Sequence, residues 1–250
     1  MTERGVFLTA EWRNLLMLNY AVAPSLLLPH VPAGTELDSC DGQTYMSLVA
    51  FEFNKARVGG VSIPFHRSFE EVNLRFYVRR GERRGVVFIR ELVPRFAVAA
   101  IARIFFGENY SSLPMTHAIQ FEQGDVRGEF NWGEGADACS VSVTTRGPGY
   151  IPPDDSLGQF ITEHYWGYAT QRDGSCVEYE VQHPRWIVRD AEMARLTGDA
   201  SSYYGSEFAA ILRGIPDSAF LAEGSSVIVF KGARVDSSTA GITGTTRRGE

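Results

Sequence analysis

Residues 69–78, FEEVNLRFYV, alternate between apolar and polar side chains at every second position. From residue 71 onward, one side carries Val72, Leu74, Phe76 and Val78, all of them apolar. The other side carries a carboxylate, an amide, a guanidinium and a phenol, namely Glu71, Asn73, Arg75 and Tyr77. Because successive side chains of a β-strand point to opposite faces, this alternation predicts a strand whose apolar face packs on a core.

The polar face of this strand has two interpretations. An antiparallel sheet commonly has one solvated face, so these side chains would form an outer surface. In a barrel the face would instead point inward. Glu71 and Arg75, about 13 Å apart at ~3.3 Å per residue, would then contact opposite ends of one small ligand, with Asn73 between them. Under that interpretation the three residues line an enclosed cavity and Arg75 binds an anionic group, but the pattern leaves both interpretations open.

Short β-prone runs recur along the whole chain, between turn signals rich in Gly, Pro and Asp-Gly. This arrangement predicts a mainly β protein built from hairpins and meanders. Strands are expected at residues 43–53, 69–78, 86–92, 117–123, 125–132, 138–146, 160–171, 176–183 and 225–235. No internal repeat or linker divides the chain, so residues 1–235 are expected to form one domain and the polar end, 236–250, a disordered tail.

A few segments are expected to be helical. The clearest is 94–106, because Pro94 suits the first helical position and only Arg95 and Arg103 interrupt its apolar surface. This helix is expected to pack against the sheet, with Gly107 after its end. Shorter helical pieces are expected at the start of 9–20, within 24–34, and near 188–197 and 206–213.

Composition narrows the function classes. The net charge of −6 argues against a general nucleic-acid partner, which would need a basic surface. The three cysteines lie far apart without metal-ligand spacing, which indicates a reduced, cytoplasmic protein. The first 20 residues lack the pattern of a signal peptide, and the apolar run at 25–32 is too short and too rich in proline to span a membrane.

No familiar catalytic or metal-binding motif is present. The sequence has no phosphate-binding glycine loop, no HExxH and no GxSxG, and no two of its five histidines are three or four residues apart, so we expect neither metal nor cofactor. Two stretches rich in aromatic residues, 163–168 and 181–186, fall on neighbouring predicted strands. Core packing is the favoured interpretation. The alternative is a pocket wall, with polar groups supplied by His164, Tyr168 and His183.

The order of several short motifs resembles the YqjF-like (DUF2071) family, over roughly residues 10 to 235. The matching elements are Trp12, Asn19-Tyr20, Pro32, Gly34, Leu37-Asp38, Glu71 to Val78, Gly85 to Phe88, Leu113-Pro114 and Val181 to Trp186. That family is similar in fold to acetoacetate decarboxylase. The resemblance therefore implies a single, mainly antiparallel β-barrel-like domain with an enclosed pocket and a few packed helices.

The same resemblance bears on the chemistry. Acetoacetate decarboxylase uses a Schiff-base lysine activated by a second lysine. Here the corresponding positions, after Pro114, hold Met115 and Thr116, which would line the pocket without supplying an amine. The chain has only two lysines, Lys55 and Lys231, and neither matches the lysine motif. The resemblance therefore implies a protein without Schiff-base chemistry.

Two functional hypotheses follow. The first is a lyase- or isomerase-type enzyme for a small carbonyl or carboxylate metabolite, working by dehydration, cyclisation or tautomerisation. Arg75 would bind the anionic group, Glu71 would act as general acid or base, and Tyr77 or His117 would hydrogen-bond a developing oxyanion. The second is a binding module that holds a small ligand in the same pocket without chemistry. The partner is a small molecule in both cases, and homo-oligomer formation stays open.

Overall fold

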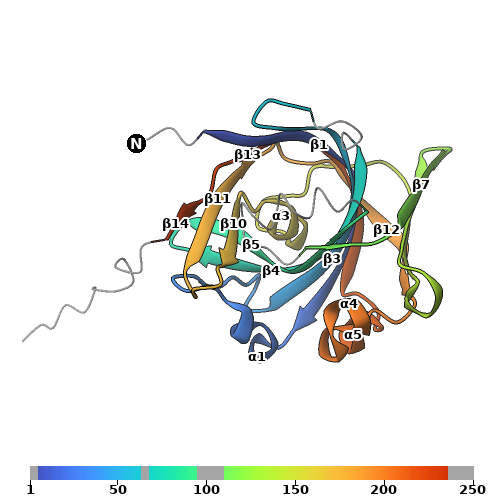
Figure 1. Cartoon of the computed structure of the whole chain (residues 1–250). Helices are drawn as coiled ribbons and strands as arrows, with labels where there is room; N and C mark the ends of the chain where they lie inside the picture. The colour runs from blue at the N-terminus through green and yellow to red at the C-terminus, as the bar shows by residue number, and fades with distance from the viewer. Residues whose placement is uncertain (1–4, 63–67, 95–109, 236–250) are drawn as a thin grey trace, which may run out of the picture.

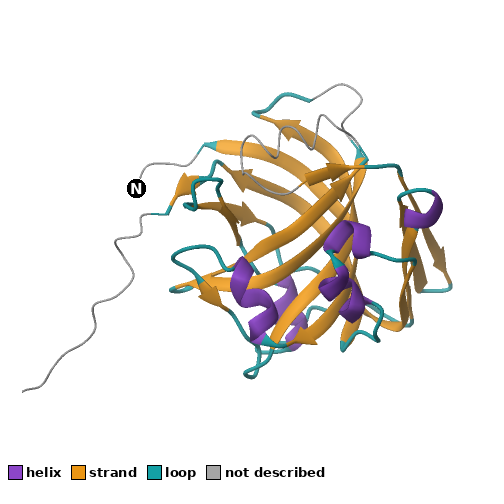
Figure 2. Cartoon of the chain, turned by 60° about the horizontal axis from the view of Figure 1, so that its bottom comes forward, coloured by secondary structure: helices purple, strands orange, loops and turns teal. Residues whose placement is uncertain are grey.

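The structure is a computed structural model that describes residues 5–62, 68–94 and 110–235. Its strands are β1 (Val6–Val22), β2 (Glu36–Leu37), β3 (Thr44–Val58), β4 (Phe69–Arg80), β5 (Arg83–Val93), β6 (Tyr110–Ser112), β7 (Met115–Glu122), β8 (Asp125–Trp132), β9 (Cys139–Thr145), β10 (Trp166–Thr170), β11 (Cys176–Gln182), β12 (Val188–Thr197), β13 (Ser218–Phe230) and β14 (Ala233–Arg234). Its helices are α1 (Pro24–Leu27), η1 (Leu28–His30), η2 (Gly135–Asp137), α3 (Leu157–Thr162), α4 (Ser201–Tyr204) and α5 (Ser206–Leu212). Figure 2 shows that most of the described chain is strand and that the helices are short.

The strands form a ring. Neighbours pair in the order β11, β10, β5, β4, β3, β1 and β13, and β11 then pairs with β13 through Val181 opposite Val229 and Gln182 opposite Ile228. All these pairs are antiparallel except β10 with β5. Figure 1 looks along the ring and shows α3 inside it. The predicted mainly β, mostly antiparallel and barrel-like architecture is therefore confirmed.

The sheet continues past the ring. From β13 it runs through β12, β9, β8 and β7, and this extension stands beside the ring (Figure 1). An outer core fills the space between the extension, α5 and the outside of the ring. Its fully buried members come from both sides, as with Leu16 and Leu48 on the ring and Phe130 and Val141 on the extension.

Strand β4 separates two cores. Its apolar set, Val72, Leu74, Phe76 and Val78, belongs to the outer core. Tyr77, from the other set, belongs to an inner core inside the ring, together with Val49, Phe51 and the α3 residues Phe160 and Ile161. Strand β4 is therefore buried on both faces, and the solvated-face interpretation of this strand is wrong.

Two predicted helices are strands instead. Residues 9–20 lie in β1, which pairs with β3 on one side and β13 on the other, and residues 188–197 form β12. Partners distant in sequence provide these ladders, and such contacts override a weak local helix preference. Conversely, the start of the expected strand 160–171 is helix α3, which begins where the Ser156 hydroxyl accepts a hydrogen bond from the backbone N–H of Gln159.

Other predictions hold. The meander of β7, β8 and β9, the hairpin of β10 and β11, and helix α5 are confirmed close to their expected bounds. The expected helix 94–106 and the tail 236–250 lie outside the described residues. In the described part of the chain, every helix falls short of the length and hydropathy of a membrane span.

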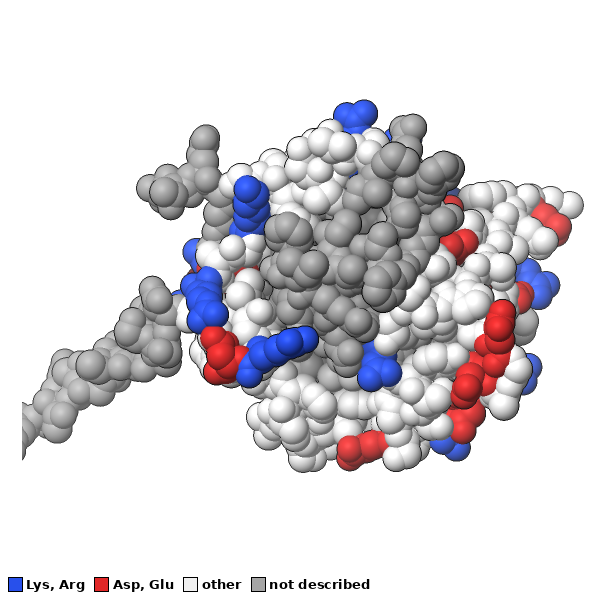
Figure 3. Space-filling view, viewed as in Figure 1, with Lys and Arg blue, Asp and Glu red and all other residues white. Residues whose placement is uncertain are grey.

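Basic and acidic side chains are mixed around the rim of the face in Figure 3.

Replacing Gly224 by alanine tests how closely β1 and β13 approach. Gly224 has φ +77° opposite Arg13, and a Cβ atom there would lie 2.0 Å from the carbonyl oxygen of Trp12 and 2.8 Å from Cδ1 of Leu15. We expect Gly224→Ala to lower the free energy of unfolding by on the order of 3 kcal/mol or more in urea titrations. Gly42→Ala is the control, because Gly42 has φ +78° and open space around it.

The control carries only the backbone cost of a left-handed alanine, about 1–2 kcal/mol. Equal urea midpoints for the two variants would show that β1 and β13 do not make this close contact.

Candidate functional site

The polar face of β4 points into the ring. Three of its residues lie opposite inward positions of β3: Glu71 opposite Phe51, Asn73 opposite Val49, and Arg75 opposite Ser47. The exposed fractions of Glu71, Asn73, Arg75 and Tyr77 are 3%, 2%, 9% and 1%, in the same order. The sequence left the orientation of this face open, and the structure buries it beside the inner core.

Arg75 has spare hydrogen-bonding capacity. Its Nη2 donates to the carbonyl oxygen of Ile161, in the last turn of α3, at 3.2 Å. Its guanidinium carbon lies 5.7 Å from the centre of the Tyr77 ring. Among the described residues, the buried Nε of Arg75 has no hydrogen-bond partner. Arg75 therefore brings a positive charge and an unused donor to the inside of the ring.

Buried carboxylates lie on the same inner wall. Asn73 Nδ2 donates to Glu71 Oε1 at 2.9 Å, and within the described part of the chain Asn73 Oδ1 has no partner. Glu91 of β5 lies directly opposite Asn73 and is 2% exposed. Sequence reasoning missed Glu91, because a bulge between Leu74 and Arg75 shifts the pairing register and breaks the simple alternation along β5.

Tyr77 is the end of a buried hydrogen-bond chain. Asn19 Nδ2 donates to Ser218 Oγ at 3.1 Å, and Asn19 Oδ1 accepts from Ser47 Oγ at 2.6 Å. The Tyr77 hydroxyl lies 2.6 Å from the same Ser47 oxygen. A serine hydroxyl has one hydrogen, and here Asn19 receives it, so Tyr77 must donate to Ser47. The Tyr77 proton is therefore not available to an oxyanion, which is a correction to the role expected from the sequence.

Two histidines face the same interior. His164 follows α3 and is buried, with its ring 4.6 Å from that of Tyr77 and 5.1 Å from that of Phe160. Burial lowers the pKa of His164 to about 4. His183 stacks on Trp186 at 4.1 Å, and burial lowers its pKa to about 4 as well, with a further contribution from the charge of Arg75. Both imidazoles are therefore neutral at pH 7.

Asp38 lies beside His164, and sequence reasoning did not single it out as a site residue. Its Oδ2 is 3.5 Å from His164 Nε2 and 2.7 Å from Arg84 Nε. Burial by itself would raise the pKa of Asp38, but these contacts with His164 and Arg84 lower it to about 2. Asp38 is thus a buried, ionised carboxylate at the end of the ring.

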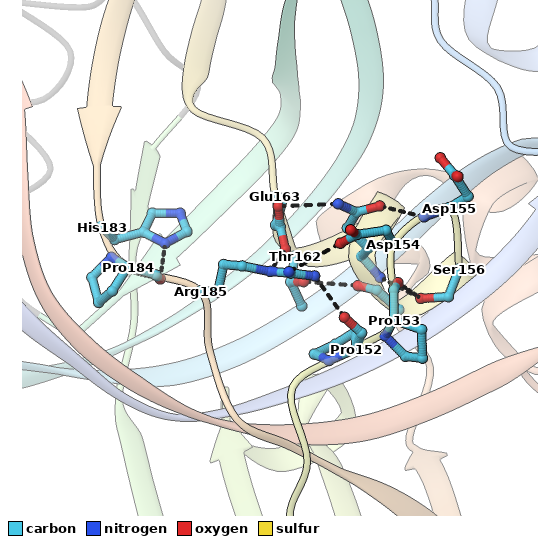
Figure 4. A network of polar contacts seen from close by, with 12 residues as sticks. Pro152, Pro153, Asp154, Asp155, Ser156, Thr162, Glu163, His183, Pro184 and Arg185 are labelled. Atoms are coloured by element: carbon cyan, nitrogen blue, oxygen red, sulfur yellow. Dashed lines mark hydrogen bonds and ion pairs between the residues drawn. The ribbon is translucent and has the colours of Figure 1, made fainter.

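An anchor network holds the histidine-bearing segments together (Figure 4). Arg185 forms an ion pair through Nε with Glu163, and its Nη2 donates to the carbonyl oxygen of Pro152 at 2.6 Å. Glu163 directly precedes His164, and Arg185 lies two residues after His183. The network therefore ties the segment that bears His164 to the segment that bears His183.

The remaining predicted site residues lie outside the ring. His117 contacts Glu52 at 3.3 Å and Glu70 at 2.8 Å, on the face of β4 opposite Glu71. Its neighbours on β7 are no closer to the interior, because Met115 packs on the outer core and Thr116 is exposed. Tyr168 is buried in the outer core, where its hydroxyl donates to the carbonyl oxygen of Arg83 at 3.4 Å. Four of the predicted site residues are thus separated from Arg75, because β7 belongs to the extension and β10 turns Tyr168 outward.

Neither lysine reaches the interior. Lys55 is 69% exposed and pairs with Glu11 at 2.7 Å, and Lys231 is exposed next to Gly5. Within residues 5–62, 68–94 and 110–235, no group of three or more His, Cys, Asp or Glu side chains has the geometry of a metal site.

Replacing Arg75 by alanine tests how much the buried Arg75 contributes to the free energy of unfolding. In Arg75→Ala the Ile161 carbonyl loses its donor and the guanidinium no longer packs over the Tyr77 ring, so we expect a loss of about 1–3 kcal/mol in the free energy of unfolding. Arg146→Ala is the matched control, because Arg146 is 71% exposed in its pair with Glu192 and should change stability by less than about 0.5 kcal/mol. Urea titrations in which both variants match wild type would contradict the buried position of Arg75.

The lowered pKa of His164 makes stability depend on pH. Between pH 6.5 and pH 4 the unfolded chain protonates this histidine while the folded chain does not, so stability falls as the pH falls. The full effect is up to roughly 3 kcal/mol. We expect His164→Gln to reduce the slope of unfolding free energy against pH over this range, with His183 contributing the rest, whereas the exposed control His30→Gln should leave the slope as in wild type. Parallel plots for wild type and His164→Gln would show that His164 is not buried in the neutral form.

Solved structures share this fold at low sequence identity. The enduracididine biosynthesis enzyme MppR complexed with pyruvate aligns with a TM-score of 0.68 at 12% identity, covering 95% of this chain and 93% of that one. An acetoacetate decarboxylase-like enzyme from Sphingomonas wittichii RW1 aligns with a TM-score of 0.66 at 13% identity, covering 92% and 93%. For the acetoacetate decarboxylase of Legionella pneumophila the TM-score is 0.63 at 13% identity, covering 93% and 88%.

Sequence comparison supplies the family. The uncharacterized protein YqjF of Bacillus subtilis (strain 168) is 29% identical over 202 residues, which cover 75% of this chain and 78% of that protein. The model of the DUF2071 family, described as an uncharacterized conserved protein, matches residues 9–226. This match spans most of β1 through β13 and includes every residue of the inner polar wall. The chain therefore belongs to the DUF2071 family and has the fold of the acetoacetate decarboxylase-like enzymes.

Proposed function

We propose that this protein binds a small carbonyl-containing carboxylate inside the ring and acts on it by acid–base chemistry. The observation that carries the proposal is the buried Arg75, whose Nε has no hydrogen-bond partner among the described residues. Leaving a buried charged donor unsatisfied costs stability. A ligand carboxylate that bridges Nε and an Nη atom in bidentate fashion would remove this cost.

The surroundings of Arg75 suit a ligand with one charged end. Part of the inner core is apolar and rich in aromatic rings, with Trp12 packed against Phe51, Phe53 and Trp186 at centroid distances of 5.5, 5.8 and 6.2 Å. Ligand sites typically combine such an apolar wall with a few convergent polar groups. Arg75 would hold the carboxylate, and the aromatic rings would contact the rest of the ligand.

The proposed chemistry is proton transfer rather than amine catalysis. Dehydration, cyclisation and tautomerisation all require a group that removes a proton and a group that returns one. Glu71 is the proposed acid or base, because it is buried on the same wall as Arg75 and Asn73 positions its Oε1. A Schiff base would need an amine near Arg75, whereas Lys55 and Lys231 both lie on the surface.

A non-catalytic binding module is the second candidate. The observation in its favour is the hydrogen-bond chain that ends at Tyr77, because this chain uses the phenol proton that an oxyanion would otherwise receive. A pocket that binds through Arg75 alone would still hold an anionic ligand, but it would not exchange protons with that ligand.

Binding of pyruvate and acetoacetate, measured by isothermal titration calorimetry, tests the proposal. Pyruvate is a suitable probe because the structural relative MppR is described in complex with it. We expect wild type to bind at least one of the two, and Arg75→Lys to bind at least about tenfold more weakly, because lysine keeps the charge but loses bidentate contact. Arg146→Ala should bind like wild type, because Arg146 is exposed and paired with Glu192.

Borohydride provides the second arm of this experiment. Incubation with either keto acid and sodium borohydride should leave the protein mass unchanged, because neither lysine is placed to form a Schiff base with a ligand held by Arg75. A stable adduct on Lys55 or Lys231 would instead support amine catalysis and contradict the proposed acid–base chemistry. If wild type binds neither keto acid, the proposed substrate class is wrong.

A further inference from the structure

We propose that His164 is a base that removes a proton from the bound ligand, and that Asp38 is the positioning residue that holds its imidazole ready. This inference rests on the proposed function, because it assumes that the ligand carboxylate sits at Arg75. It adds a proton-transfer pair to the inner wall on the side of α3, distinct from Glu71 on β4.

His164 lies close enough to Arg75 to act on the same ligand. The Tyr77 ring is the common neighbour, with the Arg75 guanidinium 5.7 Å and the His164 ring 4.6 Å from its centre. Arg75 also donates to Ile161, only three residues before His164 in the chain. A three- or four-carbon keto acid whose carboxylate is bound by Arg75 would therefore extend along Tyr77 toward the imidazole.

Asp38 selects the tautomer of His164. Its Oδ2 lies 3.5 Å from Nε2, which is long for a hydrogen bond but close enough for the carboxylate to repel a lone pair and attract an N–H. The hydrogen of the neutral ring therefore sits on Nε2, and Nδ1 carries the lone pair. Both ring nitrogens are buried and make no hydrogen bond in the described part of the chain, but only Nε2 has a carboxylate oxygen within 4 Å. A basic nitrogen inside the ring is thus left for a ligand.

Asp38 is itself held firmly. Its Oδ1 accepts from the backbone N–H of Ser39 at 3.0 Å, its Oδ2 accepts from Arg84 Nε at 2.7 Å, and its own N–H donates to the Tyr77 carbonyl at 3.0 Å. Two contacts hold the carboxylate and the third holds its backbone, and the carboxylate stays ionised over the physiological pH range. This arrangement orients the imidazole and would stabilise the positive charge that His164 gains on accepting a proton.

The proton transfer is balanced without a further reactant. The Nδ1 lone pair takes a proton from the carbon next to the ligand carbonyl, and the C–H electron pair forms the carbon–carbon double bond of an enolate. The carbonyl π electrons move onto oxygen, where the positive charge of Arg75 is nearby. The imidazolium formed on His164 then returns its proton to carbon, or to a leaving hydroxyl if the ligand carries one, and the neutral ring is restored.

Exchange of the pyruvate methyl protons with deuterium, followed by proton NMR in D₂O, measures this step directly. Wild type should catalyse the exchange. His164→Gln should slow it at least about 100-fold, the scale of a lost general base, while the Kd for pyruvate changes less than about threefold. His30→Gln is the matched control and should exchange at the wild-type rate, because His30 is exposed on η1, away from the ring interior.

Nitrogen-15 NMR of the histidine side chains tests the role of Asp38 without any ligand. Wild type should show His164 neutral and protonated on Nε2, and Asp38→Asn should give a mixture of tautomers together with an exchange rate at least about tenfold lower. A purely structural role for Asp38 would change the melting temperature but leave the tautomer of His164 as it is. The tautomer of His164 in wild type needs no variant, so this spectrum alone can refute the assignment even if His164→Gln does not fold.

The outcomes separate the two proposals. If wild type exchanges pyruvate protons and His164→Gln does so equally fast, the role of His164 is refuted while the proposed function stands. If wild type binds pyruvate without exchanging its protons, the protein is a binding module and His164 is not a base. A hydrogen on Nδ1 refutes the assignment whatever the ligand, and failure to bind either keto acid removes the proposed function and this inference together.

Discussion

The pairing of β11 with β13 determines the environment of both faces of every other strand in the ring. Because these two strands meet, the sheet closes and each wall strand has an inside and an outside instead of a wet face and a dry one. The extension and α5 then cover part of the outside, so β4 is buried on both faces. A strand with a polar face can occupy such a wall only if the groups on that face find partners inside.

The inside of the ring is arranged around α3. This short helix carries Phe160 and Ile161 into the inner core, presents a carbonyl to Arg75, and leads directly to His164. The ion pair of Arg185 with Glu163 ties its end to the segment that bears His183. Charged and aromatic groups from distant parts of the chain are thereby held inside the ring, where β4 contributes Glu71 and β5 contributes Glu91.

Much of the fold was readable from local pattern, and the failures have common causes. The meander β7–β9 and the hairpin β10–β11 were predicted because alternation and turn residues lie within the same few residues. Strands β1 and β12 were mistaken for helices because their ladders depend on partners far along the chain. Among site residues, His117 was misplaced because alternation does not reveal which sheet a strand joins, and Glu91 was missed because a bulge shifted the register.

The sequence by itself determined that β4 has two chemically distinct faces, that the chain holds only two lysines, and that its net charge is negative, because these are properties of residue order and composition. The tertiary structure decided which face of β4 looks into the ring, that α3 enters the interior, and that Asp38 meets His164 across more than a hundred residues. Those outcomes depend on ring closure and on long-range strand register. Neither ring closure nor register can be read from a short segment of sequence. Both depend on contacts between strands that are distant in the chain.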